Sequence, residues 1–403
     1  MIISNLRHAV NLVTPSTPLT LPEIIESLTT SSSGQSVTVE SANNVATAYR
    51  CINVISDDVA KMPLQAFISR SKGKVERMRP SNWEQNIAWL LEVSPNRWMT
   101  PFVFKKTVIK WLITHGNAYV WEPPRWLSPR RELFILPTTG VLPMYDLNGN
   151  LWYQVTFANR ESEFIPGVEV MNLVINSTDG ITGRGVITFA RESIGRQLGA
   201  YETQGKFYAQ GLNPGGILWV NGEANKDARA KIRDAYTEAM SGSENAYRLA
   251  VMDNKVSKFE QITMKPVDAQ FLQSIEHNDL EIANFFGMPL HKLNMGKQAY
   301  NSNEQQNLEY LNTTLDPYLV QFEESARLVF LNEIQQNDTY FRFNRDSLLR
   351  TDAKTRAETL EKRILSGQMS PNEARQVEDW PEYPDGNRYY IPANMQEVGK
   401  AKE

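Results

Sequence analysis

Two long helical patterns with a short mixed segment between them place the tightest constraint on the fold of this chain. Apolar residues recur at helical spacing from Val186 to Gln210, and a Gly-Leu-Asn-Pro sequence follows that ends a helix. A second helical pattern covers residues 267–286. Between the two patterns the sequence predicts strand GGILWV, a helix from Lys226 to Met240, and strands RLAVMD and SKFEQITM. We therefore predict a compact α/β unit over residues 212–263 that is bracketed by two helices.

The first of these helices carries three interior glycines, Gly195, Gly199 and Gly205. Each interior glycine destabilises a helix by about 1 kcal/mol relative to alanine, so three of them together require a structural reason. The simplest reason is the close approach of a neighbouring helix, which could belong to another subunit.

The N-terminal half is predicted to contain helices, a hairpin and short strands. Residues 14–41 are rich in Ser, Thr and Pro, so residues 1–43 are predicted to form a mobile arm. The elements predicted after the arm are a helix from Val45 that stops near Met62-Pro63, a hairpin of LQAFIS and KVERM, a helix capped by Thr100 and ended by Gly116, a strand directly after it, and strands ELFILP, LWYQVTF and VMNLVIN.

The C-terminal part is predicted to be mostly helical. A helix over residues 304–334 contains Pro317, which should kink or restart it. Strand YFRFN comes next, and a helix from Asp352 to Leu365 follows it, ended by Gly367. A last helix begins at Ser370, where Ser-Pro-Asn-Glu has the spacing of a capping box.

Composition is that of an ordinary globular protein. Of the 403 residues 41% are hydrophobic, and no apolar run reaches the length of about eighteen residues that a membrane-spanning helix needs. The N-terminus lacks the basic flank and apolar core of a signal peptide. The single cysteine, Cys51, cannot form an internal disulfide and is predicted to fill the core of a protein from a reducing, cytoplasmic setting.

The sequence carries no recognisable signature of catalysis or of metal binding. Residues 179–185 (DGITGRG) lie between a strand and a helix but match neither glycine-rich phosphate-binding motif, so a tight turn is favoured over a nucleotide site. His277 and Glu281 could share a helix face, but two ligands do not make a metal site. We predict no catalytic residue, no metal site and no cofactor.

Charge is unevenly distributed along the chain. Residues 267–335 hold three Lys and Arg against ten Asp and Glu, a net charge of −7 in a chain whose total is −4. Within that acidic segment, residues 287–303 (GMPLHKLNMGKQAYNSN) contain Lys292, Lys297 and His291 but no acid. Two interpretations stay open at this point: solvated helix faces, or a surface that faces a polyanion and touches it only through one cationic loop.

Seven strings occur in an order that is typical of one family. They are AYRCINVISDDVAKMPL (48–64), residues 91–119 with PNRWMT and HGNAY, DGITGRGV (179–186), FYAQGLNPGG (207–216), IANFFGMPLHKL (282–293), residues 303–317, and FNRDSLLRTDAKTRAETLEKRILSGQMSPN (343–372). No single string is decisive, but their order from about Asn44 to Pro384 resembles the portal proteins of tailed bacteriophages, specifically the HK97 type.

The resemblance implies an α+β portal fold with an α/β wing, a two-helix stem, an α/β clip insertion, a tunnel loop and a helical C-terminal crown. The implied boundaries are 1–43 for the arm, 44–186 with a strand near 339–345 for the wing, 187–211 and 264–286 for the stem helices, 212–263 for the clip, 287–303 for the tunnel loop, 304–350 for a long kinked helix and wing strand, and 351–403 for the crown and C-terminal tail.

A portal of this family would assemble in the host cytoplasm into a dodecameric ring at one capsid vertex of the virion, and would be no enzyme. Its expected partners are other copies of itself, double-stranded DNA contacted transiently and without sequence readout, the terminase large subunit, a head-tail adaptor and the major capsid or scaffold protein, with no membrane. DNA would be packaged through the ring by the terminase motor and later ejected through it.

The physics of such a channel assigns roles to charged residues. Acidic stem helices would repel the duplex from the wall, while loop residues touch phosphates briefly. The expected channel-facing acids are Glu276, Asp279 and Glu281. The expected tunnel-loop contacts are His291, Lys292, Asn294, Lys297, Gln298 and Tyr300. The expected docking residues of the clip are Lys226, Arg229, Lys231 and Arg233.

Two other protein classes stay in view. A soluble enzyme with an unrecognised α/β site would be a monomer or a small oligomer. A head adaptor would also form rings, but adaptors are much shorter than 403 residues.

Overall fold

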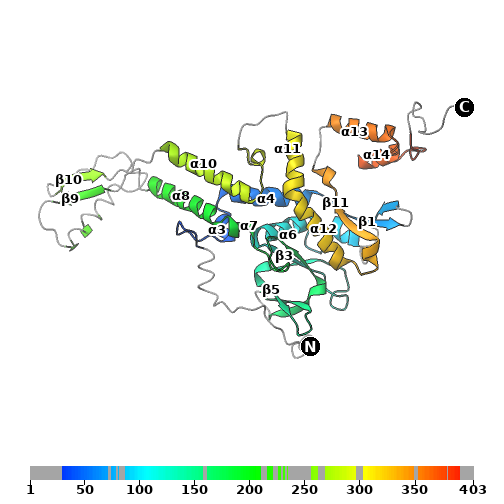
Figure 1. Ribbon diagram of the computed structural model, residues 1–403, viewed down its shortest axis with the longest axis horizontal. Coiled ribbons are helices and arrows are strands. Elements are labelled where there is room, and N and C mark those ends of the chain that lie inside the picture. Colours follow the sequence, from blue (N-terminus) through cyan, green and yellow to red (C-terminus); the bar gives the residue numbers. More distant parts are fainter. Residues whose placement is uncertain are drawn as a thin grey trace. The chain divides into compact units, whose positions relative to one another are not determined.

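The computed structural model describes residues 30–70, 74–78, 80, 87–157, 161–209, 216–220, 226–227, 230–231, 234, 256–261, 268–295, 303–348, 353–378 and 380–390. Figure 1 labels the helices and strands. The chain divides into two compact units. The first unit takes in residues 1–298 and 309–343, and the second takes in residues 299–308 and 344–403.

Two helices that pack against each other contribute much of the core of the first unit. α4 (Ala46–Lys61) ends before Met62-Pro63, as predicted, and α6 (Pro101–His115) begins after Thr100, whose hydroxyl accepts a hydrogen bond from the Val103 N–H. Gly116 ends α6 in the left-handed conformation with a φ of 90°. The two helices bury a set of apolar side chains that includes Ile52, Ile55, Val108 and Leu112.

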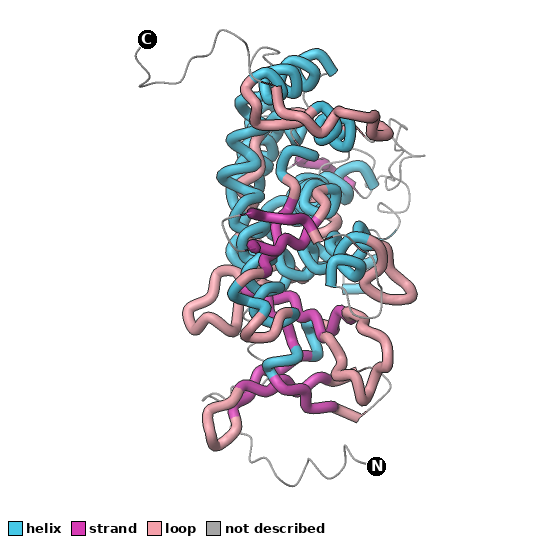
Figure 2. The backbone as a smooth tube through the Cα atoms, turned by 90° about the vertical axis from the view of Figure 1, so that its right-hand side faces the viewer, coloured by secondary structure: helices cyan, strands magenta, loops and turns pink. Residues whose placement is uncertain are grey.

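The described strands, which are magenta in Figure 2, form four small antiparallel sheets instead of one large sheet. In spatial order the sheets are β11 (Thr339–Phe343), β1 (Leu64–Arg70) and β2 (Lys74–Arg77); β4 (Phe134–Leu136), β3 (Asn117–Trp121) and β8 (Val170–Val174); β5 (Val141–Tyr145), β6 (Leu151–Val155) and β7 (Glu163–Pro166); and β10 (Val256–Gln261) with β9 (Gly216–Val220).

The sheet of β11, β1 and β2 joins distant parts of the chain. β1 and β2 form the predicted hairpin, and β11 is the predicted strand YFRFN, which pairs with β1 from Leu64↔Phe343 to Ile68↔Thr339. Phe343 also packs edge-on against Phe322 of α12 (Asp316–Phe330), with ring centroids 5.6 Å apart. β11, although distant in the sequence, therefore packs into the core of the first unit.

The central strands were predicted in part. The strands after α6 and in ELFILP, LWYQVTF and VMNLVIN are confirmed as β3, β4, β6 and β8, whereas β5, β7 and the short helix α5 (Ile87–Glu92) lie outside the predicted elements. β5 contains Pro143 and β7 ends at Pro166, and proline lowers the strand signal because it cannot donate to a sheet. Tyr119 and Tyr153 pack edge-on at the centre of this region, with ring centroids 5.3 Å apart.

The two long helical patterns are confirmed. The first gives α7 (Val186–Phe189) and α8 (Arg191–Ala209), and the second gives α10 (Asp268–Phe285), which lies beside α8 (Figure 1). Buried Asn278 of α10 donates hydrogen bonds to Ser193 O and to Gln197 Oε1, both at 2.7 Å. Polar groups therefore fix how the two helices meet.

The prediction of a mobile arm up to residue 43 is wrong for its last part. From Thr30 the chain is folded: Thr30 bridges Ser36, and α3 (Val39–Ala42) starts with a capping box at Thr38. Ser32 donates from its N–H at 3.0 Å and from its hydroxyl at 2.6 Å to the Glu192 carboxylate of α8. Composition misled here because Ser and Thr in this segment cap a helix and bond to α8 instead of staying solvated.

The same segment explains one of the three helical glycines and corrects the predicted helix–helix contact. A Cβ on Gly195 would lie 2.1 Å from Ser31 Oγ and 2.4 Å from Ser31 Cβ. Gly199 has only ordinary contacts with this segment, and nothing lies within 4 Å of a Cβ on Gly205. Within this subunit close approach is therefore required at Gly195 alone, where the neighbour is the N-terminal segment and not a helix, and a contact of Gly199 or Gly205 with another subunit stays a prediction.

The α/β unit between α8 and α10 is described only in part. Strands GGILWV and SKFEQITM are confirmed as the antiparallel pair β9 and β10, and the described residues of the predicted helix (226, 227, 230, 231 and 234) are helical. Strand RLAVMD lies outside the described residues.

After α10 the chain forms a short 3-10 helix, η4 (Leu290–Leu293), and later a long interrupted helix. α11 (Asn303–Tyr310) passes into a π-helical turn (Leu311–Leu315) and then into α12, which has Pro317 in its first turn. The predicted restart at Pro317 is confirmed, because the missing N–H of proline is tolerated at the start of a helix.

The second unit contains α13 (Ala353–Leu365) and α14 (Pro371–Val377), as predicted. Gly367 follows α13 with a φ of 71°. At Ser370 both hydrogen bonds of the predicted capping box with Glu373 are formed.

Candidate functional site

The three acids predicted to face a channel lie on α10 in different surroundings. Glu276 is exposed. Asp279 is half-buried and accepts a hydrogen bond from the Thr47 hydroxyl of α4 at 2.6 Å. Burial raises the pKa of Asp279 and the charge of Glu276 adds to this, while the Thr47 hydrogen bond opposes it. The Asp279 carboxylate is therefore turned toward α4, and its predicted place on a channel wall stays a prediction.

Glu281 is engaged with α8 within the same chain. Its carboxylate accepts a hydrogen bond from the Ser193 hydroxyl at 2.9 Å and pairs with the Arg196 guanidinium, and His277 Nε2 lies 3.4 Å away. The predicted role of Glu281 as a channel-facing acid stays a prediction, now for a carboxylate that is already paired within its own chain. Of the three acids, Glu276 alone is exposed and has no such pairing with another described residue.

The predicted tunnel loop is described from Gly287 to Met295. Gly287 has a φ of 60°, and its carbonyl accepts a hydrogen bond from the Thr314 hydroxyl of the π-helical turn at 2.6 Å. Asn294 ends η4 in the left-handed conformation with a φ of 57° and is exposed, whereas His291 is partly buried. The predicted contacts Lys297, Gln298 and Tyr300 lie outside the described residues.

Lys292 is held by the body of the first unit. Its ammonium lies 3.6 Å from Asp58 Oδ2 of α4 and 5.0 Å from the centre of the Tyr310 ring. Its backbone carbonyl accepts hydrogen bonds from Arg50 Nε at 3.0 Å and from Arg50 Nη2 at 2.8 Å. The structure does not bring the Lys292 ammonium out with the exposed loop residues, which sequence reasoning missed because Asp58 is far away in the chain.

Two of the four predicted docking residues of the clip lie among the described residues. Lys226 and Lys231 are helical and exposed. Arg229 and Arg233 lie outside the described residues.

The groups considered for catalysis have structural roles. Burial raises the pKa of the Cys51 thiol to about 12, so it stays protonated and unreactive at neutral pH. The carboxylate of Asp179 accepts hydrogen bonds from the N–H groups of Ile181 and Thr182 at 2.8 and 2.7 Å, which also lower its pKa. The turn at 179–185 therefore uses its own acid where a phosphate-binding turn would present free N–H groups. Within the described residues, no cluster of three or more His, Cys, Asp or Glu is arranged to hold a metal ion.

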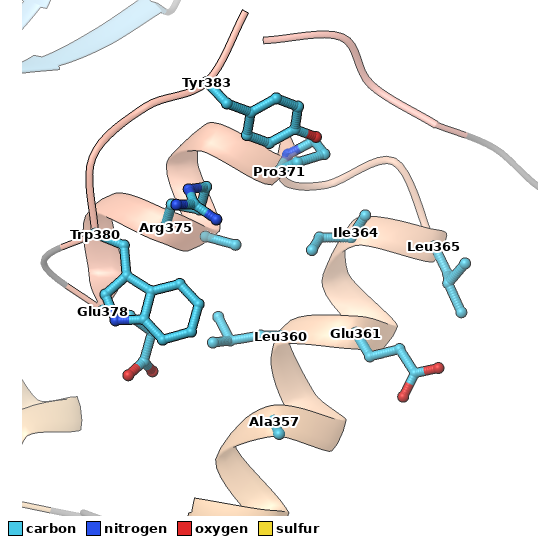
Figure 3. A pocket seen from close by; sticks show the side chains of 11 residues that line it. Ala357, Leu360, Glu361, Ile364, Leu365, Pro371, Arg375, Glu378, Trp380 and Tyr383 are labelled. Atoms are coloured by element: carbon cyan, nitrogen blue, oxygen red, sulfur yellow. The ribbon is translucent and has the colours of Figure 1, made fainter. Parts of the chain in front are cut away.

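The second unit has a groove of about 420 Å³ between α13 and α14 that sequence reasoning did not predict. Figure 3 shows Leu360 and Ile364 of α13 across from Trp380 and Arg375. The Arg375 guanidinium lies 5.3 Å from the centre of the Trp380 ring and 5.6 Å from that of Tyr383, and its Nε donates a hydrogen bond to Pro381 O at 2.7 Å. Arg375, the one basic residue among those that line the groove, thus interacts with neighbouring residues of the second unit.

No helix among the described residues has the length and apolar character needed to cross a bilayer. The family model for phage portal proteins matches residues 46–379, which is most of the chain. The chain belongs to the phage portal protein family. This is a family of structural proteins, and the observed α+β fold is that of a portal.

Individual portal proteins match over most of their length. The probable portal protein of Streptomyces phage phiC31 is 28% identical over 407 residues, which cover 95% of this chain and 85% of the relative. The portal protein of Enterobacteria phage HK97 is 27% identical over 380 residues, covering 91% and 87%.

Solved structures share the fold. An HK97-family phage portal protein from Corynebacterium diphtheriae has a TM-score of 0.57 at 15% identity, with 78% of this chain and 96% of that chain covered. A chain in the neck of a native gene transfer agent particle with C12 symmetry has a TM-score of 0.54 at 15% identity, covering 95% and 99%.

Proposed function

We propose that this chain is the repeating subunit of a dodecameric ring at one vertex of a phage head. Double-stranded DNA would be packaged through the ring by the terminase motor and would later leave through it. The observation that carries the proposal is the match to the portal family over residues 46–379, supported by a structural neighbour from a particle neck with C12 symmetry. The local charges of α10 and the loop after it are consistent with this role.

A conducting channel must contact DNA weakly. Each phosphate that a fixed cation neutralises adds about −0.9 to the slope of log K against log salt, so a wall of cations would hold the duplex in place. Glu276 offers an exposed negative charge on α10, and the loop that follows offers Lys297 together with Gln298 and Tyr300. We infer that Glu276 repels the duplex and that these loop residues make the brief phosphate contacts.

The clip is the part proposed to dock the terminase large subunit during packaging and a head-tail adaptor afterwards. Lys226 and Lys231 are exposed on its helix, and Arg229 and Arg233 fall within the helix that the sequence predicts from Lys226 to Met240. The major capsid or scaffold protein would hold the ring in the shell during assembly in the host cytoplasm.

Electron microscopy of the purified protein tests the proposal directly. The expected result is a toroid with a central hole of about the width of a DNA duplex. Compact monomers would contradict the ring. In heads assembled with Lys297→Glu portals we expect intact rings and reduced DNA filling, and normal filling would remove Lys297 from the mechanism.

A further inference from the structure

The base of the predicted tunnel loop is fastened to the first unit at three points. Thr314 of the π-helical turn donates a hydrogen bond to Gly287 O, and Arg50 of α4 donates two to Lys292 O. The third point is the Lys292 side chain itself, which reaches Asp58 and Tyr310. Two elements distant in sequence, α4 and the helix that starts at α11, therefore hold residues 287–292 in place.

Asp58 needs the Lys292 charge. The Asp58 side chain is only 8% exposed, and its Oδ1 pairs with Lys61 at 3.1 Å. Its Oδ2 is buried and has no hydrogen bond among the described residues, so the Lys292 ammonium at 3.6 Å is the cation that faces it. Removal of the Lys292 ammonium would leave Oδ2 buried without a cation facing it, which destabilises the folded state.

Tyr310 forms the other side of the Lys292 site. Its ring is 2% exposed, and burial together with the nearby Asp58 charge raises the pKa of its hydroxyl. The ammonium lies over the face of this ring, where the π electrons attract a cation. Tyr310 directly precedes the π-helical turn, a feature that is often found at functional sites.

We propose that Lys292 is a positioning residue, which clamps the base of the tunnel loop between Asp58 and Tyr310 and does not itself contact DNA. To reach a phosphate, its ammonium would have to leave both partners and would leave the buried Oδ2 of Asp58 without a facing cation. The clamp sets where the remainder of the loop leaves the body of the subunit. This inference rests on the proposed function, because it assigns a role within the channel loop.

The experiment compares Asp58→Asn, Lys292→Gln and the double variant in assembled rings, with Lys61→Gln as the matched control. Lys61→Gln removes the other partner of Asp58 and leaves the loop contacts intact. The Lys61 side chain is 60% exposed. The first readout needs no DNA: the rate of tryptic cleavage after Lys292. Asp58→Asn should raise this rate about tenfold, the change that corresponds to a loss of about 1.4 kcal/mol of local stability, while Lys61→Gln should leave it near the wild-type rate.

The second readout is DNA filling of heads that carry each ring. Asp58→Asn and Lys292→Gln should reduce filling alike although Asp58 is not in the loop, and the double variant should be no worse than either single one, because all three remove the same clamp. Normal filling with Asp58→Asn but poor filling with Lys292→Gln would make Lys292 a phosphate contact and overturn the proposal, as would unchanged cleavage in Asp58→Asn. If wild-type rings filled no heads, the proposed function would fail, and the cleavage rate would still decide for or against the clamp.

Discussion

Gly195→Ala tests whether the N-terminal segment is docked on α8. A Cβ at this position would lie 2.1 Å from Ser31 Oγ and 2.4 Å from Ser31 Cβ. A serine hydroxyl can rotate away, but the Cβ moves only with the backbone, so residues 31–33 must shift. Ser31 is 4% exposed, which leaves it little room to do so.

The expected size follows from two opposing effects. Alanine in place of glycine stabilises a helix interior by about 1 kcal/mol. Overpacking a buried contact destabilises by about 1–3 kcal/mol. Because the second effect falls on the docked segment, amide hydrogen exchange of residues 31–36 should become about 5- to 150-fold faster, at about 1.4 kcal/mol for each factor of ten.

Hydrogen exchange followed by mass spectrometry measures this change peptide by peptide. Gly205→Ala is the matched control, because nothing lies within 4 Å of its new Cβ and only the helix propensity changes. Ser31→Gly should restore slow exchange in the Gly195→Ala background, since it removes the atoms that collide. If Gly195→Ala and Gly205→Ala gave the same exchange in residues 31–36, the docking of this segment on Gly195 would be refuted.

Three further predictions concern the core, pH and the second unit. Burial lowers the pKa of Lys105 to about 8 in the folded state, below its usual value of about 10.4. Between these two pH values the unfolded chain binds more protons than the folded one, so the contribution of Lys105 to stability rises with pH. Urea unfolding should therefore show that wild type gains about 2 kcal/mol over Lys105→Met between about pH 8 and about pH 9.5, and a pH-independent difference would contradict this. Phe322→Ala should lower the free energy of unfolding by about 3–5 kcal/mol, because it empties a fully buried site and removes the edge contact to Phe343, and Leu328→Ala, at 71% exposure, is the control. Ser370→Ala should destabilise α14 by about 1 kcal/mol through loss of its cap, seen as faster amide exchange at Glu373, whereas Ser366→Ala should leave that amide unchanged.

Local signals in the sequence predicted the elements that are fixed by local chemistry. The Thr100 cap, the left-handed Gly116 and the Ser370 capping box depend on residues within four positions of one another, and each is present in the structure. The apolar period of α4 likewise determines which face is buried. β5 was missed because Pro143 interrupts a pattern that pairing with β6 rescues only in three dimensions.

Contacts across long sequence distances could not be predicted in this way. Gly195 indicated a close neighbour, but nothing in the helix pattern identifies that neighbour as Ser31, 164 positions earlier. In the same way, the carboxylate partner of Lys292 is Asp58, which belongs to a helix far away in the sequence. Because the sequence shows no acid near Lys292, its charge was interpreted as a contact to a polyanion. A basic residue in a loop identifies a need for negative charge without saying whether DNA or the protein supplies it.

The field that a channel wall presents depends on which charges remain unpaired, and net charge does not measure this. Residues 267–335 sum to −7, yet Asp279 is bonded to Thr47 and raised in pKa by burial, and Glu281 is paired with Arg196. Lys292 is likewise paired with Asp58. The charges available to act on DNA are therefore fewer, for the acids and for the cation, than composition suggests. Since opposite charges near a surface attract within hydrogen-bond distance far more strongly than across a hydrated channel, the subunit satisfies these groups internally first. We therefore expect exposed Glu276 on α10, together with the loop residues beyond Met295, to act on DNA, and variants of these residues should change DNA filling without changing the stability of the subunit.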